Sequence, residues 1–318
     1  MLVTSDLPAL FILSVAVVFG ALWGSFFNVA IYRWPREMSV VTPPSHCPAC
    51  GAPIPAWRNV PIFGYFMLRG RAACCGARLS PRYVVVELLG AAIATALAAK
   101  YIVHAPEGTS LASAAGEALV YFAFGGGLLI ATFVDLEHME IPDEVSLPGA
   151  ALGLATAGLR ADPGAESAAL GAGGGFLAVQ LIFVWSYERL TGRRGMGEGD
   201  SKLLMMIGAF LGWRGALFAL VAGAFQGLIA ALVNYFAGGK EESESVSVSE
   251  PESESVSESV SVSEPESESE PEPESESEAD ADGGALKIPF GPFLALGALE
   301  FLFFGEKLLA LYARAAGF

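Results

Sequence analysis

Charged residues are scarce in this chain. Only 16% of its 318 residues are Asp, Glu, Lys or Arg, whereas 53% are hydrophobic, and the mean hydropathy is +0.51. Soluble domains carry about 25% charged residues, so the composition excludes an ordinary water-soluble globular protein. The chain also has only three histidines and four cysteines. So few histidines do not indicate a metal site or a catalytic triad built on histidine.

Long stretches with few or no charges account for this composition. A helix needs about 20 apolar residues to cross a bilayer, and most of eight apolar runs approach that length, the sixth being shorter. The runs are residues 8–31, 82–103, 116–135, 145–160, 168–188, 203–213, 214–236 and 288–313. The first run is too long for a cleaved signal peptide and lacks a basic segment before it. We therefore predict an all-α polytopic membrane protein with about eight transmembrane helices, which contacts membrane lipid.

One segment lacks basic residues altogether. Residues 241–282 contain 17 of the 34 acidic side chains and neither Lys nor Arg, so the rest of the chain is nearly neutral. This Ser/Glu/Val/Pro tract cannot bury enough apolar surface to offset the entropy of ordering. We expect residues 237–287 to form a disordered acidic loop, with a cation-binding or partner-binding role as the alternative. No nucleic-acid partner is expected.

The loop between the first two runs is rich in arginine. It carries a single acid, Glu37, against Arg33, Arg36, Arg58, Arg69, Arg71, Arg78 and Arg82. The positive-inside rule makes this loop cytoplasmic, and counting spans puts residues 136–144 and 189–202 on the same side. The predicted organisation is a first transmembrane helix (1–31), a cytoplasmic loop module (32–81), a transmembrane catalytic core (82–236), the acidic loop (237–287) and a last transmembrane helix (288–318).

Two aspartates lie at the ends of apolar runs. Asp135 ends the third run, and Asp200 opens the sixth after Gly195-Met196-Gly197-Glu198-Gly199. Ionisable groups at membrane depth cost roughly 2.5–3.5 kcal/mol on insertion scales, and both aspartates fall at the predicted cytoplasmic face. Two such carboxylates can act as acid and base to activate a water. Gly197 and Gly199 would let a peptide approach closely; alternatively they only cap and pack a helix end, with Asp200 as its N-cap.

Three other polar side chains near these aspartates have simpler interpretations. Asp143 follows Pro142 at the start of the fourth run, where we expect a helix N-cap. Glu198 is given no role. His138 has no partners spaced as a metal site or a catalytic triad, so we expect it at the surface.

The segment Gly197-Glu198-Gly199-Asp200 resembles the Gly-x-Gly-Asp signature of type IV prepilin peptidases. The surroundings of Asp135 are similar to the family's segment around its other catalytic aspartate, and residues 24–33 and 78–87 agree with two further blocks. The resemblance covers nearly all of the chain except residues 237–287. It implies that Asp135 and Asp200 are the catalytic pair of a membrane aspartyl endopeptidase.

The resemblance also implies a substrate and a location. Such an enzyme removes the short basic leader of type IV prepilins and pseudopilins at the cytoplasmic face of the bacterial inner membrane. Many relatives also methylate the new N-terminal amine with S-adenosylmethionine, and the large cytoplasmic loop resembles that bifunctional type.

Four cysteines lie in this loop: Cys47, Cys50, Cys74 and Cys75. In a reducing compartment, clustered cysteines indicate metal rather than disulfides. The family has two Cys-x-x-Cys pairs in a zinc-ribbon-like module, but here Ala72 stands in place of one cysteine. Closure of a four-thiolate site would then need an unusual local backbone. A zinc held by all four would be structural, because it leaves no open position for substrate.

Three other functions remain open. One is a peptidase without methyl transfer. An ion-coupled transporter also places carboxylates and glycines in broken helices, but near the middle of the bilayer. A structural scaffold for pilus assembly would leave the two aspartates without a task.

Overall fold

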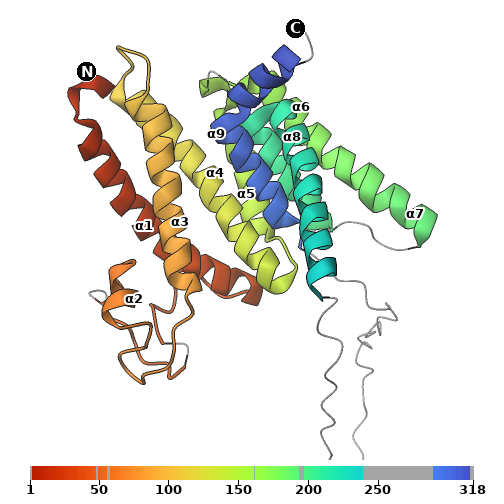
Figure 1. The fold of residues 1–318 in the computed structure, drawn as a ribbon. Coiled ribbons are helices and arrows are strands. Elements are labelled where there is room, and N and C mark those ends of the chain that lie inside the picture. Colours follow the sequence, from red (N-terminus) through yellow and green to blue (C-terminus); the bar gives the residue numbers. More distant parts are fainter. Residues whose placement is uncertain are drawn as a thin grey trace, which may run out of the picture. The chain divides into compact units, whose positions relative to one another are not determined.

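The described part of the chain is helical. In the computed structural model, residues 2–47, 49–55, 58–160, 162–192, 197–238 and 289–315 are described, and these contain no β-strand beyond three isolated bridges. The prediction of an all-α protein is confirmed. The elements are η1 (Thr4–Asp6), α1 (Ala9–Arg33), η2 (Trp34–Arg36), α2 (Phe63–Met67), α3 (Arg82–Ala98), η4 (Ala99–Val103), α4 (Leu111–His138), α5 (Asp143–Thr156), η5 (Ala157–Leu159), α6 (Gly164–Ala178), η6 (Val179–Ser186), α7 (Tyr187–Thr191), α8 (Glu198–Gly238) and α9 (Gly291–Ala315) (Figure 1).

The predicted apolar runs fall on helices. Among the described residues, five helical stretches are long and apolar enough to cross a membrane: Ala9–Arg36, Arg82–Val103, Leu111–His138, Gly164–Leu190 and Glu198–Phe236. The fourth run lies on the shorter α5, and the eighth lies on α9, whose apolar part is Gly291–Gly305. The sixth and seventh runs both lie in α8. Their predicted boundary falls next to Gly212, where the backbone leaves the helical region (φ 71, ψ −177).

A buried cation stabilises this break in α8. The guanidinium of Arg160, a residue that is 6% exposed, donates hydrogen bonds to the backbone oxygens of Gly153 (2.6 Å), Ala209 (3.0 Å) and Phe210 (2.7 Å). The last carbonyl groups of a helix have no partner within that helix. Arg160 therefore supplies donors to two carbonyl groups of α8 just before the break at Gly212, those of Ala209 and Phe210, and ties them to α5 through Gly153.

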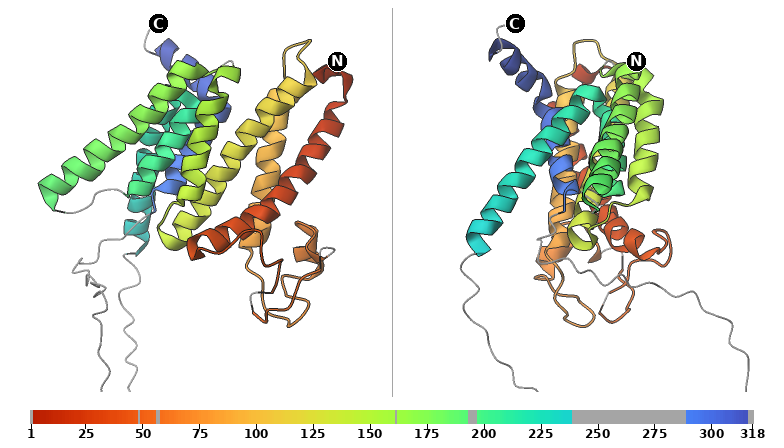
Figure 2. Two further views of the ribbon diagram at one scale, coloured as in Figure 1. Left: turned by 180° about the vertical axis from the view of Figure 1, so that it is seen from behind. Right: turned by 90° about the vertical axis from the view of Figure 1, so that its right-hand side faces the viewer.

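Helices α1 and α3 lie side by side, as Figures 1 and 2 both show. Their backbones come together at glycines. A Cβ on Gly20 would lie 2.4 Å from the carbonyl oxygen of Gly90, and a Cβ on Gly24 would lie 2.6 Å from Cα of Glu87. Small residues allow this close approach where helices pack in a membrane. Helix α4 packs against this pair and also against α5 and α9, so it lies at the centre of the core.

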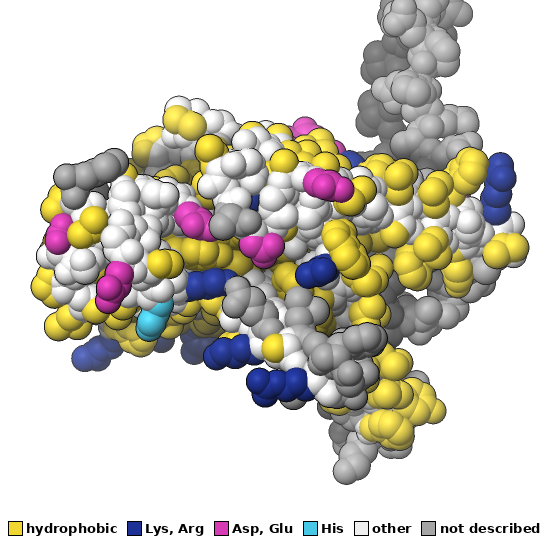
Figure 3. Space-filling view, turned by 90° about the horizontal axis from the view of Figure 1, so that it is seen from above, with side chains coloured by type: hydrophobic (Ala, Val, Ile, Leu, Met, Phe, Trp, Pro, Cys, Tyr) yellow, Lys and Arg dark blue, Asp and Glu magenta, His cyan; other side chains and the backbone are white. Residues whose placement is uncertain are grey.

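Many large hydrophobic side chains are exposed on the helices, and Figure 3 shows many of them at the surface. They include Leu10, Phe11, Val18, Leu181, Ile182 and Phe225. Apolar surface of this extent is what lipid-facing helices require. The chain is an integral membrane protein, and direct contact with lipid stays a prediction.

The chain divides into two compact units. One unit comprises residues 1–229 and 289–318 and contains all the helices except the end of α8. Of the other, residues 230–288, the structure describes only residues 230–238. The acidic loop predicted over 237–287 lies, apart from its first two residues, outside the described residues.

Candidate active site

Asp135 and Asp200 line the same cavity. Asp135 lies in the last turn of α4 and Asp200 in the first turn of α8. Both side chains are buried, with exposed fractions of 5% and 8%, and the cavity that they share has a volume of about 450 Å³. Their carboxylates are close enough to interact electrostatically. Two residues 65 positions apart in the sequence thus meet at one end of the helices.

Helix α9 completes the site by fixing Asp135. The backbone N–H of Gly291, the first residue of α9, donates a 2.8 Å hydrogen bond to Oδ2 of Asp135. A Cβ at position 291 would lie 2.7 Å from that oxygen. The sequence analysis missed Gly291. The available signal was the pair Gly291-Pro292 at the start of the last apolar run, because proline favours the first turn of a helix and glycine permits a close approach.

Asp200 is held by its own helix end. Its Oδ2 accepts a 3.3 Å hydrogen bond from the backbone N–H of Gly197. Because α8 begins at Glu198, Asp200 is the third residue of the helix, and the alternative in which it is the N-cap is wrong. An acidic side chain at this position commonly reaches back to the N–H of the N-cap residue. The bond therefore both orients Asp200 and caps α8.

The two glycines of the motif lie differently. Gly199 packs on Ile141, since a Cβ at position 199 would lie 2.9 Å from the Cβ of Ile141. Gly197 is exposed and lines the cavity, where its backbone N–H donates the hydrogen bond to Asp200. The absence of a side chain at Gly199 thus serves the close packing of two protein segments. Substrate binding at Gly197 and Gly199 stays a prediction.

The remaining side chains make the cavity acidic. Asp143 is not an N-cap as predicted, because Pro142 holds that place and Asp143 begins α5. Both of its carboxylate oxygens accept hydrogen bonds from Nζ of Lys202, each at 2.7 Å, so its charge is paired. His138 is exposed, as expected. Six carboxylates and one ammonium group line the cavity: Asp135, Glu140, Asp143, Glu144, Glu198, Asp200 and Lys202.

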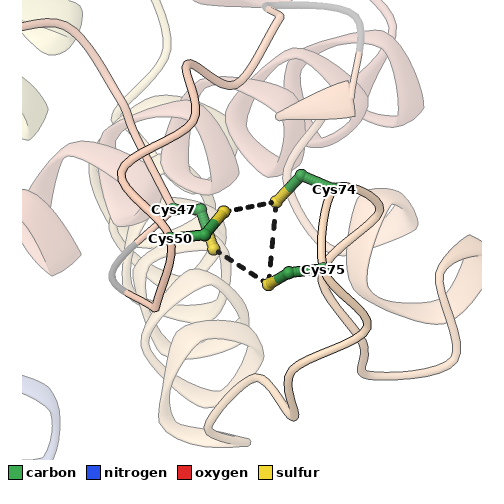
Figure 4. Close-up of side chains that lie close together, drawn as sticks. All are labelled: Cys47, Cys50, Cys74 and Cys75. Atoms are coloured by element: carbon green, nitrogen blue, oxygen red, sulfur yellow. Dashed lines mark hydrogen bonds between the residues drawn. The ribbon is translucent and has the colours of Figure 1, made fainter.

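The four cysteines form one cluster in the loop that joins α1 to α3 (Figure 4). Their sulfur atoms all lie within 4.8 Å of one another, with separations of 3.8 Å for Cys47 and Cys75, 3.3 Å for Cys50 and Cys74, and 3.9 Å for Cys74 and Cys75. Zinc–sulfur bonds of about 2.3 Å in a tetrahedron place sulfur atoms about 3.8 Å apart. The four thiols therefore fit a tetrahedral zinc ion.

The irregular spacing does not require an unusual backbone, contrary to expectation. Two turns, one beginning at Cys47 and one at Ala72, have the same backbone hydrogen bonds. In each, the N–H of the first residue bonds to the carbonyl five positions later, and the N–H four positions later bonds back to the first carbonyl. Ala72 thus occupies the place of the first cysteine, Cys75 that of the second, and Cys74 supplies its thiol from within the turn. The paired bonds are Cys47 N to Ala52 O, Gly51 N to Cys47 O, Ala72 N to Ala77 O and Gly76 N to Ala72 O.

The thiols of the cluster differ in acidity. Hydrogen bonds from the backbone of Ala49 and Cys50 lower the pKa of Cys47 to about 6. Hydrogen bonds with the sulfur atoms of Cys50 and Cys47 raise the pKa of Cys74 to about 12, because they favour its protonated form. Four thiolates at these distances need a cation among them.

Both halves of the chain match known protein families. Residues 18–101 match the bacterial peptidase A24 N-terminal domain, and residues 122–232 match the type IV leader peptidase family. A prepilin leader peptidase/N-methyltransferase of Neisseria gonorrhoeae is 35% identical over 265 residues, which cover 74% of this chain and 87% of that protein. The chain belongs to the type IV leader peptidase family. Proteins with the same description from Pseudomonas putida and Dichelobacter nodosus are 33% and 35% identical, over 71% and 68% of this chain and 81% and 80% of theirs.

The candidate site residues fall in different parts of the two matched regions. Asp135 and Asp200 fall in the leader peptidase region, whereas the four cysteines fall in the N-terminal domain region. Gly291 lies beyond both matched regions. No solved structure matches the chain.

Proposed function

We propose that this protein is a membrane aspartyl endopeptidase that removes the leader peptide of type IV prepilins and pseudopilins. The observation that carries the proposal is the meeting of two buried carboxylates, Asp135 and Asp200, in one cavity at the ends of α4 and α8. Relatives of 33–35% identity are described as prepilin leader peptidases, which supports the same reaction.

The reaction needs one ionised and one protonated carboxyl group. The ionised aspartate takes a proton from a water, whose oxygen attacks the scissile carbonyl carbon, while the protonated aspartate donates its proton to the carbonyl oxygen. The tetrahedral intermediate then breaks its C–N bond, and the leaving amine takes a proton. The N–H groups of Gly291 and Gly197 hold the two carboxylates in position for these transfers.

The charge of the cavity suits the leader of such a substrate. Four further carboxylates and a single lysine surround the catalytic pair, and the leaders implied by the family resemblance are short and basic. Coulomb attraction would draw a basic leader to this side of the membrane and orient it before cleavage. In this proposal the two glycines of the motif border the path of the peptide.

We place the protein in the bacterial inner membrane with this site facing the cytoplasm. The arginine-rich loop between α1 and α3 supports that orientation. An ion-coupled transporter is disfavoured, because Asp135 and Asp200 lie in the last and first turns of their helices rather than near the middle of a span.

The proposal also includes a methyl donor and a structural metal ion. The description of the relatives as N-methyltransferases supports methylation of the new N-terminus, for which S-adenosylmethionine is the methyl donor. The cysteine cluster would hold one zinc ion through Cys47, Cys50, Cys74 and Cys75. Such a zinc would fix the loop and would take no part in hydrolysis.

The test is incubation of the purified full-length protein with a prepilin and S-adenosylmethionine, followed by mass spectrometry of the substrate. We expect loss of the leader mass and a gain of one methyl group. Loss of the leader without methylation would identify the peptidase-only alternative. An unchanged substrate, with a known prepilin peptidase cleaving it in parallel, would contradict the proposed function.

A further inference from the structure

A second cavity lies between the cysteine loop and the adjoining ends of α1 and α3. Helix side chains on its wall include Asn28 and Glu87, and loop side chains include Val60, Tyr65 and Cys74. It shares no lining residue with the aspartate cavity. Its volume is about 200 Å³, and exposed residues such as Val60 form part of its wall, so a larger ligand can extend from it into solvent.

Glu87 brings a negative charge to this cavity. Glu87 is only 8% exposed, and its Oε2 accepts a 2.7 Å hydrogen bond from the backbone N–H of Ile62. In the described part of the chain no salt bridge to Glu87 is present, although Arg33 and Arg58 also line the cavity. Buried charges are normally paired, so Glu87 is suited to a ligand that carries positive charge.

Asn28 presents a second acceptor without a donor. Its Nδ2 donates to the backbone oxygens of Tyr83 (3.0 Å) and Gly24 (3.3 Å), which fixes the orientation of the side-chain amide. Among the described residues no donor reaches its Oδ1, although the residue is only 3% exposed. Buried polar atoms are nearly always hydrogen-bonded. A carboxylate and an unpaired amide oxygen on one wall together select a ligand with a cationic centre and N–H donors.

We propose that this cavity binds the methionine end of S-adenosylmethionine, with Glu87 facing its cationic centres and Asn28 accepting a hydrogen bond from its amine. The proposal rests on the proposed function, since it locates the methyl transfer of that enzyme. The adenosine end would extend along the exposed loop. Peptide hydrolysis and methylation then take place in two separate cavities of one chain.

Charge conservation in the reaction suits this arrangement. The lone pair of the deprotonated N-terminal amine forms the N–CH₃ bond, and the S–CH₃ bond breaks with its electron pair going to sulfur. The positive charge thereby passes from sulfur to nitrogen, and the products are S-adenosylhomocysteine and a methylated ammonium. A carboxylate in this cavity faces a cation both before and after the transfer, and stabilises both.

The two cavities lie at the same end of the helices. Figure 1 shows the end of α4 and the cysteine loop at one end of the bundle. An ion pair between Arg82, at the start of α3, and Glu137, near the end of α4, joins the two regions. A cleaved prepilin would need to move only along this membrane face to present its new amine to the donor.

The experiment measures binding and both reactions on full-length protein in detergent. Isothermal titration calorimetry with S-adenosylmethionine is combined with leader cleavage and methylation read by mass. We expect Glu87→Gln, which keeps the shape of the side chain, to weaken donor binding at least about tenfold and to abolish methylation while leader cleavage continues. Glu107→Gln is the matched control, because this exposed glutamate lies in the α3–α4 connection at the opposite end of the helices.

A second variant tests the cavity without touching Glu87. Val60 is 46% exposed and lines the cavity, so Val60→Phe should occupy the ligand space and also weaken donor binding. Unchanged donor binding in both variants would overturn the assignment even where the wild type cleaves and methylates. Loss of methylation with intact donor binding would also overturn it, because the cavity would then hold the peptide amine. Absence of leader cleavage by the wild type would instead count against the proposed function.

Discussion

Asp135 on α4 accepts a hydrogen bond from the backbone N–H of Gly291 on α9, although 156 residues separate them in the chain. The last helix therefore takes part in the candidate active site, where it orients a carboxylate that a different helix supplies. The contact requires glycine, because a Cβ at position 291 would overlap the oxygen that accepts the bond. Ile141 packs beside the same glycine and also against Gly199, so the starts of α8 and α9 converge on one side chain.

Replacing Gly291 with alanine tests this relationship. The added Cβ would displace the Asp135 carboxylate, and we expect kcat for leader cleavage to fall about tenfold or more, which corresponds to about 1.4 kcal/mol in the barrier. Gly173→Ala is the control, since no atom lies within 4 Å of the Cβ that it would add. Wild-type kcat in Gly291→Ala would show that the hydrogen bond does not position the catalytic group.

The catalytic pair itself gives a direct prediction. Asp135→Asn and Asp200→Asn should each abolish leader cleavage, because an amide can neither take a proton from water nor return one. Elution in gel filtration should stay that of the wild type. Asp143→Asn removes a carboxylate of the same cavity whose charge is already paired with Lys202, and should leave cleavage nearly intact. Clear processing by either of the first two variants would remove the pair from the mechanism.

Much of the fold could be predicted from hydrophobic patterning alone. Long apolar runs have few alternatives to helices in a bilayer, and even the boundary between residues 213 and 214 falls beside the break at Gly212. The role of Arg160 could not be predicted. A single arginine at the end of an apolar run resembles an ordinary loop residue, and only the path of α8 brings the carbonyls of residues 209 and 210 to its guanidinium.

The candidate site was predictable where chemistry and sequence motif coincide, as at Asp135 and Asp200. Gly291 was missed because its function lies in a backbone N–H, which every residue except proline possesses. The cysteine loop was misjudged for another reason. Spacing along the chain suggested a distorted turn, whereas the turn that begins at Ala72 has the same two backbone hydrogen bonds as the one that begins at Cys47, and the thiol comes from Cys74 instead of position 72.

Stability should depend on Arg160. In Arg160→Leu the backbone oxygens of Gly153, Ala209 and Phe210 would lose their hydrogen bonds from the guanidinium, and a buried acceptor left unsatisfied costs about 1–3 kcal/mol. We expect a lower thermal unfolding midpoint in detergent, measured by the loss of helical circular dichroism. Arg214→Leu, which changes an exposed arginine, should shift the midpoint little. Equal midpoints for Arg160→Leu and the wild type would show that water or lipid satisfies these oxygens.

Metal content tests the assignment of the cysteine cluster, and the two equivalent turns make the test specific. Purified full-length protein should contain about one equivalent of zinc, and Cys74→Ala should release it, because loss of one ligand weakens a closed four-thiolate site. Adding Ala72→Cys to that variant restores the regular spacing of the first turn, in which the equivalent position is Cys47. Zinc should return in the double variant if Cys74 acts as a displaced ligand.

Leader cleavage should persist in all three proteins, since the aspartates line a separate cavity. Zinc below about a tenth of an equivalent in the wild type, purified without chelator, would contradict the metal site.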